Sequence, residues 1–188
     1  GSLIIEHCQL VNLPLDTPVK TDLNGIKWYK MVKEGQALAL SLSKGMFIGQ
    51  YEHSLEEKGR LLIPKAFREE LKAGAVITKG LDGCLFLYPQ AKWKALIDKL
   101  AALPLTKTDA RAFSRLLTYG ASPVEPDRIG RILIPVYLRD FAHIKNQIII
   151  AGNLDKIDIW DKATFAKYQT QIEKNSDQIA EKLTDLGI

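Results

Sequence analysis

The chain has 188 residues, of which 46% are hydrophobic and 26% charged, so it matches ordinary globular composition and can bury a core without disulfides or metals. It contains only two cysteines, no secretory signal and no apolar stretch approaching the roughly 20 residues that cross a membrane. This excludes integral membrane proteins, Cys-rich zinc sites and disulfide scaffolds, and it favours a reducing, cytoplasmic setting. The 26 basic residues exceed the 22 acidic ones, and the net charge of +4 permits nucleic-acid binding without arguing for it alone.

Residues 1–45 form an N-terminal extension in which we identify no chemical motif. It begins with Gly1-Ser2, which we expect to remain from the cleavage of a tag and which we exclude from the fold prediction. A turn signal at Asn24-Gly25 can close a short hairpin. The sequence of this segment predicts no function for it.

An internal repeat begins at Met46 and is the most informative feature of the chain. The block 59–64, Gly-Arg-Leu-Leu-Ile-Pro, recurs at 130–135 as Gly-Arg-Ile-Leu-Ile-Pro, and Arg68 meets Arg139 at the same spacing. With one inserted residue in the second copy, further apolar positions correspond: Leu85 with Ile157, Leu87 with Ile159 and Tyr88 with Trp160. Such a register over many positions indicates duplication rather than chance.

The first copy, 46–103, predicts alternating strands and helices. Pro64 and Pro89 stand where helices begin, since proline lacks only an N–H that the first helical turn leaves unused. Asp82-Gly83 is a strong hairpin turn because glycine tolerates a positive φ. The predicted order is strand 47–53, turn 56–59, strand 60–63, a short helix from Pro64, strands 75–79 and 84–88, and a longer helix from Pro89.

A linker, 104–118, is expected to hold a helix with Ala110, Phe113 and Leu117 on one face. The second copy, 119–188, repeats the pattern and ends in a C-terminal helix. Asp161 is placed to cap that helix. Its apolar positions predict burial of Phe165, Tyr168 and Ile172, and Ile179, Leu183 and Leu186 can extend it.

Each copy is too small to build a strong core alone, so we expect the two to share one. The predicted fold class is α+β, with two β-rich repeats paired about a pseudo-twofold axis and each followed by a helix. Any surface feature that occurs once in each copy is then presented twice, side by side.

Two similar loops, 56–60 and 127–131, carry the chemistry of the repeat. Each has an acidic residue, a glycine and then an arginine at the start of an apolar strand. Gly59 and Gly130 permit a tight turn. The acidic residues, Glu56 and Asp127, stand four positions before the arginines and can hold each guanidinium in one orientation.

Arg60 and Arg131 would then each present a planar fork, which suits guanine O6 and N7 or a phosphate. Lys58 and Arg128 add point charges on the same rim. One such loop is more simply explained as a surface ion pair worth about 0–1 kcal/mol. Two copies in register favour binding.

Residues 46–188 resemble the MraZ family of transcriptional regulators, which carry two tandem AbrB/SpoVT-type (swapped-hairpin) repeats; the matching stretches are 46–64, 127–135 and 157–161. The resemblance implies a cytoplasmic, nucleoid-associated and ring-forming homo-oligomer without a cofactor. It implies binding to repeated double-stranded DNA sites upstream of the division and cell-wall gene cluster, including the protein's own promoter. Arg60 and Arg131 would read the DNA.

The chain departs from the family pattern in two places. Glu56 stands where aspartate is usual, and we expect it to pair with Arg60 but to hold it less tightly, so that the first copy reads bases less strictly. Family members start at the equivalent of Met46, which leaves three origins for residues 1–45: a misassigned start codon, a genuine extension, or a fusion added by cloning. We favour the first.

Two other functions compete with DNA-dependent regulation. An AbrB-like antitoxin would bind a protein toxin, although such antitoxins usually have one repeat and a disordered tail. A thiol hydrolase would use Cys84, but the sequence shows no partner base, and we predict a buried, inert cysteine and no enzyme.

The three histidines show no metal-ligand spacing, so no metal is expected. Lys65, Arg68 and Arg139 are interpreted as solvated or phosphate-facing, and we favour the solvated interpretation.

Overall fold

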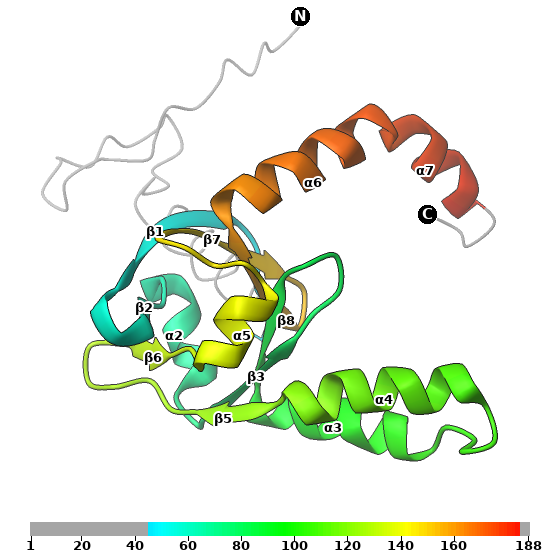
Figure 1. Ribbon diagram of the computed structural model, residues 1–188, viewed down its shortest axis with the longest axis horizontal. Coiled ribbons are helices and arrows are strands. Elements are labelled where there is room, and N and C mark those ends of the chain that lie inside the picture. Colours follow the sequence, from blue (N-terminus) through cyan, green and yellow to red (C-terminus); the bar gives the residue numbers. More distant parts are fainter. Residues whose placement is uncertain (1–44, 185–188) are drawn as a thin grey trace, which may run out of the picture. The chain divides into compact units, whose positions relative to one another are not determined.

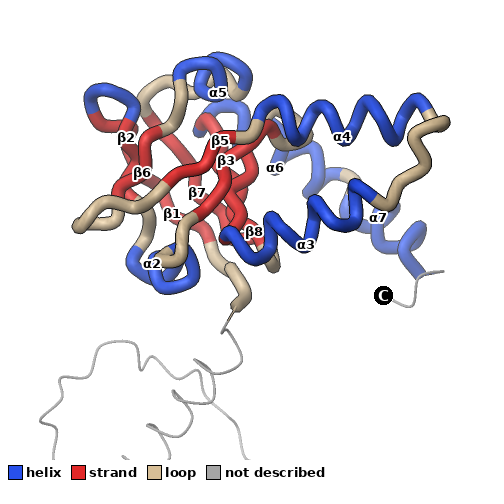
Figure 2. The backbone as a smooth tube through the Cα atoms, turned by 90° about the horizontal axis from the view of Figure 1, so that it is seen from below, coloured by secondary structure: helices blue, strands red, loops and turns tan. Residues whose placement is uncertain are grey.

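The computed structural model describes residues 45–184 (Figures 1 and 2). The extension before Gly45, with the hairpin expected at Asn24-Gly25, lies outside the described residues, as does Leu186.

The first repeat folds in the predicted order: β1 (Gln50–Glu56), the 3-10 turn η1 (Glu57–Gly59), β2 (Arg60–Leu62), α2 (Lys65–Leu71), β3 (Ala75–Lys79), β4 (Leu85–Pro89) and α3 (Gln90–Ala101). The first strand begins at Gln50 rather than Phe47, because Gly49 adopts φ +95° and leaves Phe47 in an isolated bridge to Leu154. Asp82 and Gly83 both have positive φ, as the predicted hairpin turn requires.

The second repeat repeats this order; its elements are β5 (Ser122–Val124), β6 (Arg131–Leu133), α5 (Val136–Phe141), β7 (Gln147–Asn153), β8 (Lys156–Asp161), α6 (Lys162–Lys174) and α7 (Ser176–Leu183). Helix α4 (Thr108–Gly120) precedes it and occupies most of the segment expected to link the repeats. Leu117 of α4 is buried, whereas Phe113 is 38% exposed. The limits of the linker, 104–118, stay a prediction.

Asp161 caps α6 as predicted, since its Oδ1 accepts hydrogen bonds from the N–H groups of Ala163 (3.0 Å) and Thr164 (3.2 Å). Phe165 and Tyr168 pack against Trp160 at the start of this helix. The predicted burial of Ile172 is wrong: it is 41% exposed, because only the beginning of α6 packs on β7 and β8.

One antiparallel sheet joins the repeats in the strand order β5-β3-β4-β8-β7-β1-β2-β6. The first strand of each repeat pairs with the third strand of the other, β1 with β7 and β5 with β3. The second strands pair with each other, β2 with β6, and so do the fourth, β4 with β8. This exchange of strands is the swapped-hairpin arrangement that the family resemblance implies, and the two repeats can be followed in Figures 1 and 2.

Two equivalent hydrogen bonds show the pseudo-twofold relation directly. The N–H of Ile63 donates to the carbonyl of Gly130, and the N–H of Ile134 donates to the carbonyl of Gly59, both at 2.9 Å. Each bond runs from the residue that follows the motif strand of one repeat to the turn of the other. The two turns are therefore fixed relative to each other by backbone contacts.

The larger of two buried apolar clusters takes corresponding residues from both repeats. The fully buried side chains include Leu61, Ile63, Ile77, Leu85 and Leu87 of the first repeat and Ile132, Ile134, Ile148, Ile157 and Ile159 of the second. Burying each large aliphatic side chain stabilises the fold by roughly 1.5–3 kcal/mol. Neither repeat retains this burial without the other.

Candidate nucleic-acid interface

The pairing of β2 with β6 places the two motif arginines on one face. Arg60 lies opposite Leu133 and Arg131 lies opposite Leu62. Side chains alternate along a strand, so these four residues share one face, while Leu61 and Ile132 point to the other and are 0% and 1% exposed. Standard strand geometry puts the two arginine Cα atoms roughly 8 Å apart.

The turns that lead into these strands lie together at one end of the sheet (Figure 1). Lys58 has φ +65° and Gly59 φ +80°, while Gly130 in the second turn has φ +89°. Lys58 and Arg128 are exposed beside them. Over 56–60 and 127–131 the sequence has four basic and three acidic residues. The rim therefore carries one net positive charge.

Arg131 is held by two carboxylates. Its Nε donates to Asp127 Oδ2 at 2.8 Å, its Nη2 lies 2.8 Å from the same oxygen, and its Nη1 donates to Glu56 Oε2 at 3.1 Å. Asp127 is anchored in turn, because its Oδ1 accepts the N–H groups of Arg131 (2.9 Å) and Ile129 (3.1 Å). The backbone N–H of Arg131, aided by its guanidinium, lowers the pKa of Asp127 to about 2.

The expected pairing of Glu56 with Arg60 is wrong. Glu56 is the last residue of β1 and lies opposite Arg60 in the pairing of β1 with β2, but its side chain reaches the guanidinium of Arg131 in the other repeat. Arg60 is exposed and makes no ion pair or side-chain hydrogen bond with any residue in 45–184. The two motifs, similar in sequence, therefore differ in how they hold their arginines.

Two further arginines support the turns, and the interpretation of them as solvated is wrong. Arg68 is half-buried, donates from Nε to the carbonyl of Ile63 at 2.7 Å, and packs so closely on Gly130 that a Cβ there would lie 2.5 Å from Nε. Arg139 packs in the same way on Gly59, where a Cβ would lie 2.9 Å from Cζ. Each glycine thus leaves room for a guanidinium from the opposite repeat. The sequence signal for this role is that Arg68 and Arg139 occupy the same position in the two copies.

The described residues offer no metal centre and no activated nucleophile. No group of three or more histidine, cysteine or acidic side chains within 45–184 can hold a metal ion. Cys84 is 1% exposed and its thiol donates to the carbonyl of Leu81 at 3.1 Å. Burial, together with Asp158 and Asp82 nearby, raises its pKa, so a thiolate is disfavoured. Between Gly45 and Thr184, no helix combines the length and the apolar character that crossing a membrane requires.

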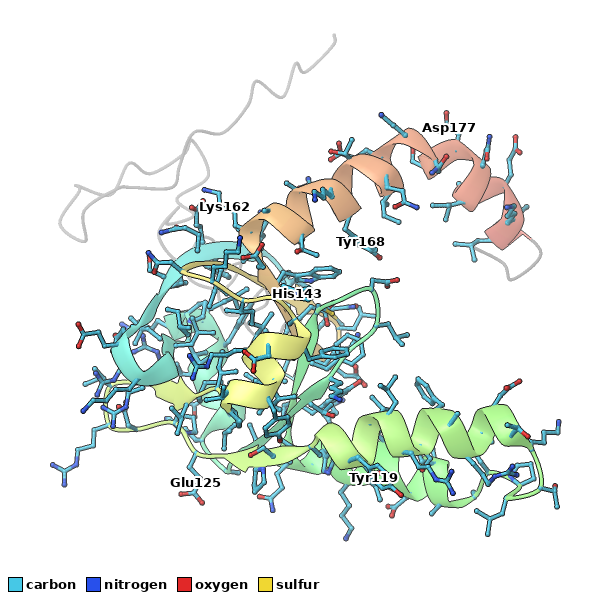
Figure 3. The ribbon with its side chains drawn as sticks, viewed as in Figure 1. Tyr119, Glu125, His143, Lys162, Tyr168 and Asp177 are labelled. Atoms are coloured by element: carbon cyan, nitrogen blue, oxygen red, sulfur yellow. The ribbon has the colours of Figure 1, made fainter. Side chains whose placement is uncertain are left out.

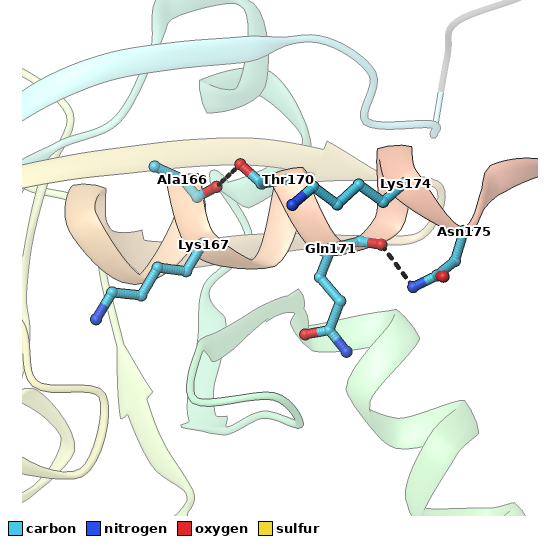
Figure 4. A pocket seen from close by; sticks show the side chains of 6 residues that line it. All are labelled: Ala166, Lys167, Thr170, Gln171, Lys174 and Asn175. Atoms are coloured by element: carbon cyan, nitrogen blue, oxygen red, sulfur yellow. Dashed lines mark hydrogen bonds between the residues drawn. The ribbon is translucent and has the colours of Figure 1, made fainter.

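Two hollows adjoin α6. One, of about 560 Å³, is lined by a single helix face: Ala166, Lys167, Thr170, Gln171, Lys174 and Asn175 (Figure 4). The other, of about 410 Å³, lies between α6, which carries Tyr168 (Figure 3), and the sheet, and the ring centroids of Tyr168 and Trp160 lie 4.8 Å apart there. In this hollow Asp158 Oδ2 accepts a hydrogen bond from Asn153 at 2.9 Å, whereas the buried Asp158 Oδ1 lies 3.7 Å from the Lys156 ammonium and has no hydrogen-bond partner among the described residues. Neither hollow presents a reactive arrangement.

Comparison with known proteins points to a family of regulators. The family model for the MraZ protein, described as antitoxin-like, matches residues 46–116 and again 117–187. Proteins named transcriptional regulator MraZ from Thermoanaerobacter sp. and Heliobacterium modesticaldum are 48% and 44% identical over 143 residues, which is 76% of this chain and 100% of each relative. The protein of that name from Pelotomaculum thermopropionicum is 47% identical over 76% of this chain and 99% of its own length.

Proposed function

The chain belongs to the MraZ family of transcriptional regulators, and on this premise we propose that it regulates transcription by sequence-specific binding to double-stranded DNA. The observation that carries the proposal is the pairing of β2 with β6, which sets Arg60 and Arg131 on one exposed face of the sheet. In this proposed role the protein catalyses no reaction and uses no cofactor.

The spacing of the two arginines suits a shared major groove. Roughly 8 Å between their Cα atoms is less than the groove's width of about 12 Å, so both guanidinium groups can enter one segment of it. A guanidinium fork can donate two hydrogen bonds to guanine O6 and N7. Lys58 and Arg128, exposed on the turns, would contact phosphates, which orient the protein but carry no sequence information.

A single chain offers few base contacts, so specific affinity requires several linked subunits. Repeated DNA sites bound by one oligomer multiply affinity through effective concentration. A head-to-tail contact that closes on itself would give a ring. By family resemblance, the sites lie upstream of the division and cell-wall gene cluster and include the protein's own promoter, and the protein works in the cytoplasm at the nucleoid.

Binding to the DNA upstream of the protein's own gene tests this proposal. Arg60→Ala or Arg131→Ala should reduce the difference in binding free energy between operator and scrambled DNA, since one bidentate pair is removed. The upper limit of this reduction is about 1–3 kcal/mol for each variant. Lys58→Ala should weaken binding to all sequences alike and lower the salt slope by about 1. The matched control is Arg115→Ala, an equal loss of charge on the exposed part of α4. If all three turn variants lose the same affinity for operator and for scrambled DNA, the turns contact only the phosphate backbone.

A toxin-binding role is the second candidate, because the matching family model is described as antitoxin-like. The chain carries two matched repeats, and α6 packs on the sheet through Phe165 and Tyr168 rather than forming an unstructured tail. Stoichiometric co-purification of a small partner that shields the protein's DNA-binding turns would favour this candidate. DNA binding by the protein purified alone favours the first.

A further inference from the structure

The ion pair between the repeats makes the two motif arginines unequal. All three guanidinium nitrogens of Arg131 lie close to a carboxylate oxygen, Nε and Nη2 to that of Asp127 and Nη1 to that of Glu56. The side chain of Arg131 is 25% exposed. Arg60, at the equivalent position, is exposed and has no such partner among residues 45–184.

Asp127 is sufficient to orient Arg131. Its carboxylate is fixed by two backbone N–H groups of its own turn, and it takes the Nε edge of the guanidinium. That leaves the Nη1 end as the remaining donor edge for a base. Glu56 accepts one hydrogen bond at this end, at 3.1 Å, and two of the five guanidinium N–H groups remain without a partner among the described residues. Glu56 therefore adds little orientation and competes with an incoming acceptor for this end.

Charge acts in the same direction. Arg131 with Asp127 and Glu56 has one net negative charge, which opposes the electronegative O6 and N7 atoms of guanine. Glu56 lies directly opposite Arg60 in the pairing of β1 with β2, but its carboxylate bonds Arg131, and Arg60 makes no ion pair with any residue in 45–184. The donors of Arg60 therefore meet DNA at a lower electrostatic cost.

We infer that Glu56 is a specificity-determining residue that restrains Arg131, so that the DNA site is read strictly by Arg60 and loosely by Arg131. The inference rests on the proposed function, since it requires that both arginines face bases. It reverses the sequence-based expectation that the first copy reads less strictly. The DNA site that this protein binds is therefore asymmetric: the guanine that faces Arg60 is strictly required, and the guanine that faces Arg131 is readily replaced.

Binding to operators with single base-pair substitutions tests this. The base pair that faces each arginine is the one whose substitution penalty disappears in Arg60→Ala or in Arg131→Ala. In the unaltered protein, substitution opposite Arg60 should weaken binding on the order of tenfold, and substitution opposite Arg131 only about twofold. Glu56→Ala should raise the second penalty towards tenfold.

Glu57→Ala is the matched control, because Glu57 is exposed on the same turn and pairs with no residue in the described part of the chain. It removes the same charge and should strengthen binding to all sequences without changing either penalty. Thermal unfolding verifies that both variants fold. Equal penalties in the unaltered protein, or the same response to Glu56→Ala and Glu57→Ala, would overturn the inference alone. Failure of the unaltered protein to distinguish operator from scrambled DNA would overturn the proposed function as well.

Discussion

At the scale of single residues, the two motif turns differ because of one methylene group and one contact. Asp127 folds back on its own turn and accepts two backbone N–H groups, whereas Glu56 spans to the other repeat. The shorter side chain of Asp127 accepts hydrogen bonds within its own turn, and the longer side chain of Glu56 reaches Arg131 in the other repeat. Equivalent sequence positions thus support different geometry.

The pH dependence of stability should reveal the contacts of Asp127. Its pKa is lowered from 3.8 to about 2 in the folded chain, so its contribution is fully present above pH 4 and is lost as the pH falls towards 2. Asp127→Asn should therefore be less stable than the parent at pH 5, and the difference should shrink towards pH 2. Denaturant unfolding at several pH values measures this. A difference that is constant over that range would show that the charge of Asp127 contributes nothing.

At the scale of elements, the cap of α6 is the clearest local determinant. Asp161 is 7% exposed and satisfies two N–H groups of the first helical turn. Asp161→Ala should lower the free energy of unfolding by about 0.5–2 kcal/mol, the usual value of an N-cap. Asp177→Ala, in the first turn of α7, is a control because Asp177 is exposed and makes no cap hydrogen bond (Figure 3). Equal losses from both variants would refute the role of the cap.

The local sequence predicts most elements because their signals are local. Asp82-Gly83 tolerates the positive φ that a two-residue hairpin turn requires, and Pro64 and Pro89 mark helix starts by their own chemistry. The crossing of Glu56 to Arg131 and the packing of Arg68 on Gly130 could not be predicted in this way. Both depend on how the repeats pair, and a motif read within one repeat contains no information about the opposite turn.

At the scale of the whole molecule, the exchanged strands make the two repeats one folding unit. Leu61 of β2 is buried against the second repeat, whereas Leu133 of β6 lies on the opposite face of the same strand pair and is 54% exposed. Leu61→Ala should cost about 2–5 kcal/mol, and Leu133→Ala should cost less than about 1 kcal/mol.

The cooperativity of unfolding gives the second test of this shared core. Unfolding followed by tryptophan fluorescence and by far-ultraviolet circular dichroism should give one coincident transition for both variants, since one core serves both repeats. Two separate transitions in Leu61→Ala would show that the second repeat remains folded alone, contrary to the exchanged-strand arrangement.

The most direct test of base reading by Arg60 and Arg131 is methylation interference on the DNA upstream of the protein's own gene. Methylation of guanine N7 blocks the acceptor that a guanidinium uses in the major groove. Arginine Cα atoms roughly 8 Å apart correspond to about two to three base pairs, so interference should fall on guanines within one such segment of each site. Arg60→Ala should abolish the strong interference and Arg131→Ala the weak one. Interference at guanines a full helical turn apart within one site, or interference that is unchanged in both variants, would contradict base reading by these two arginines.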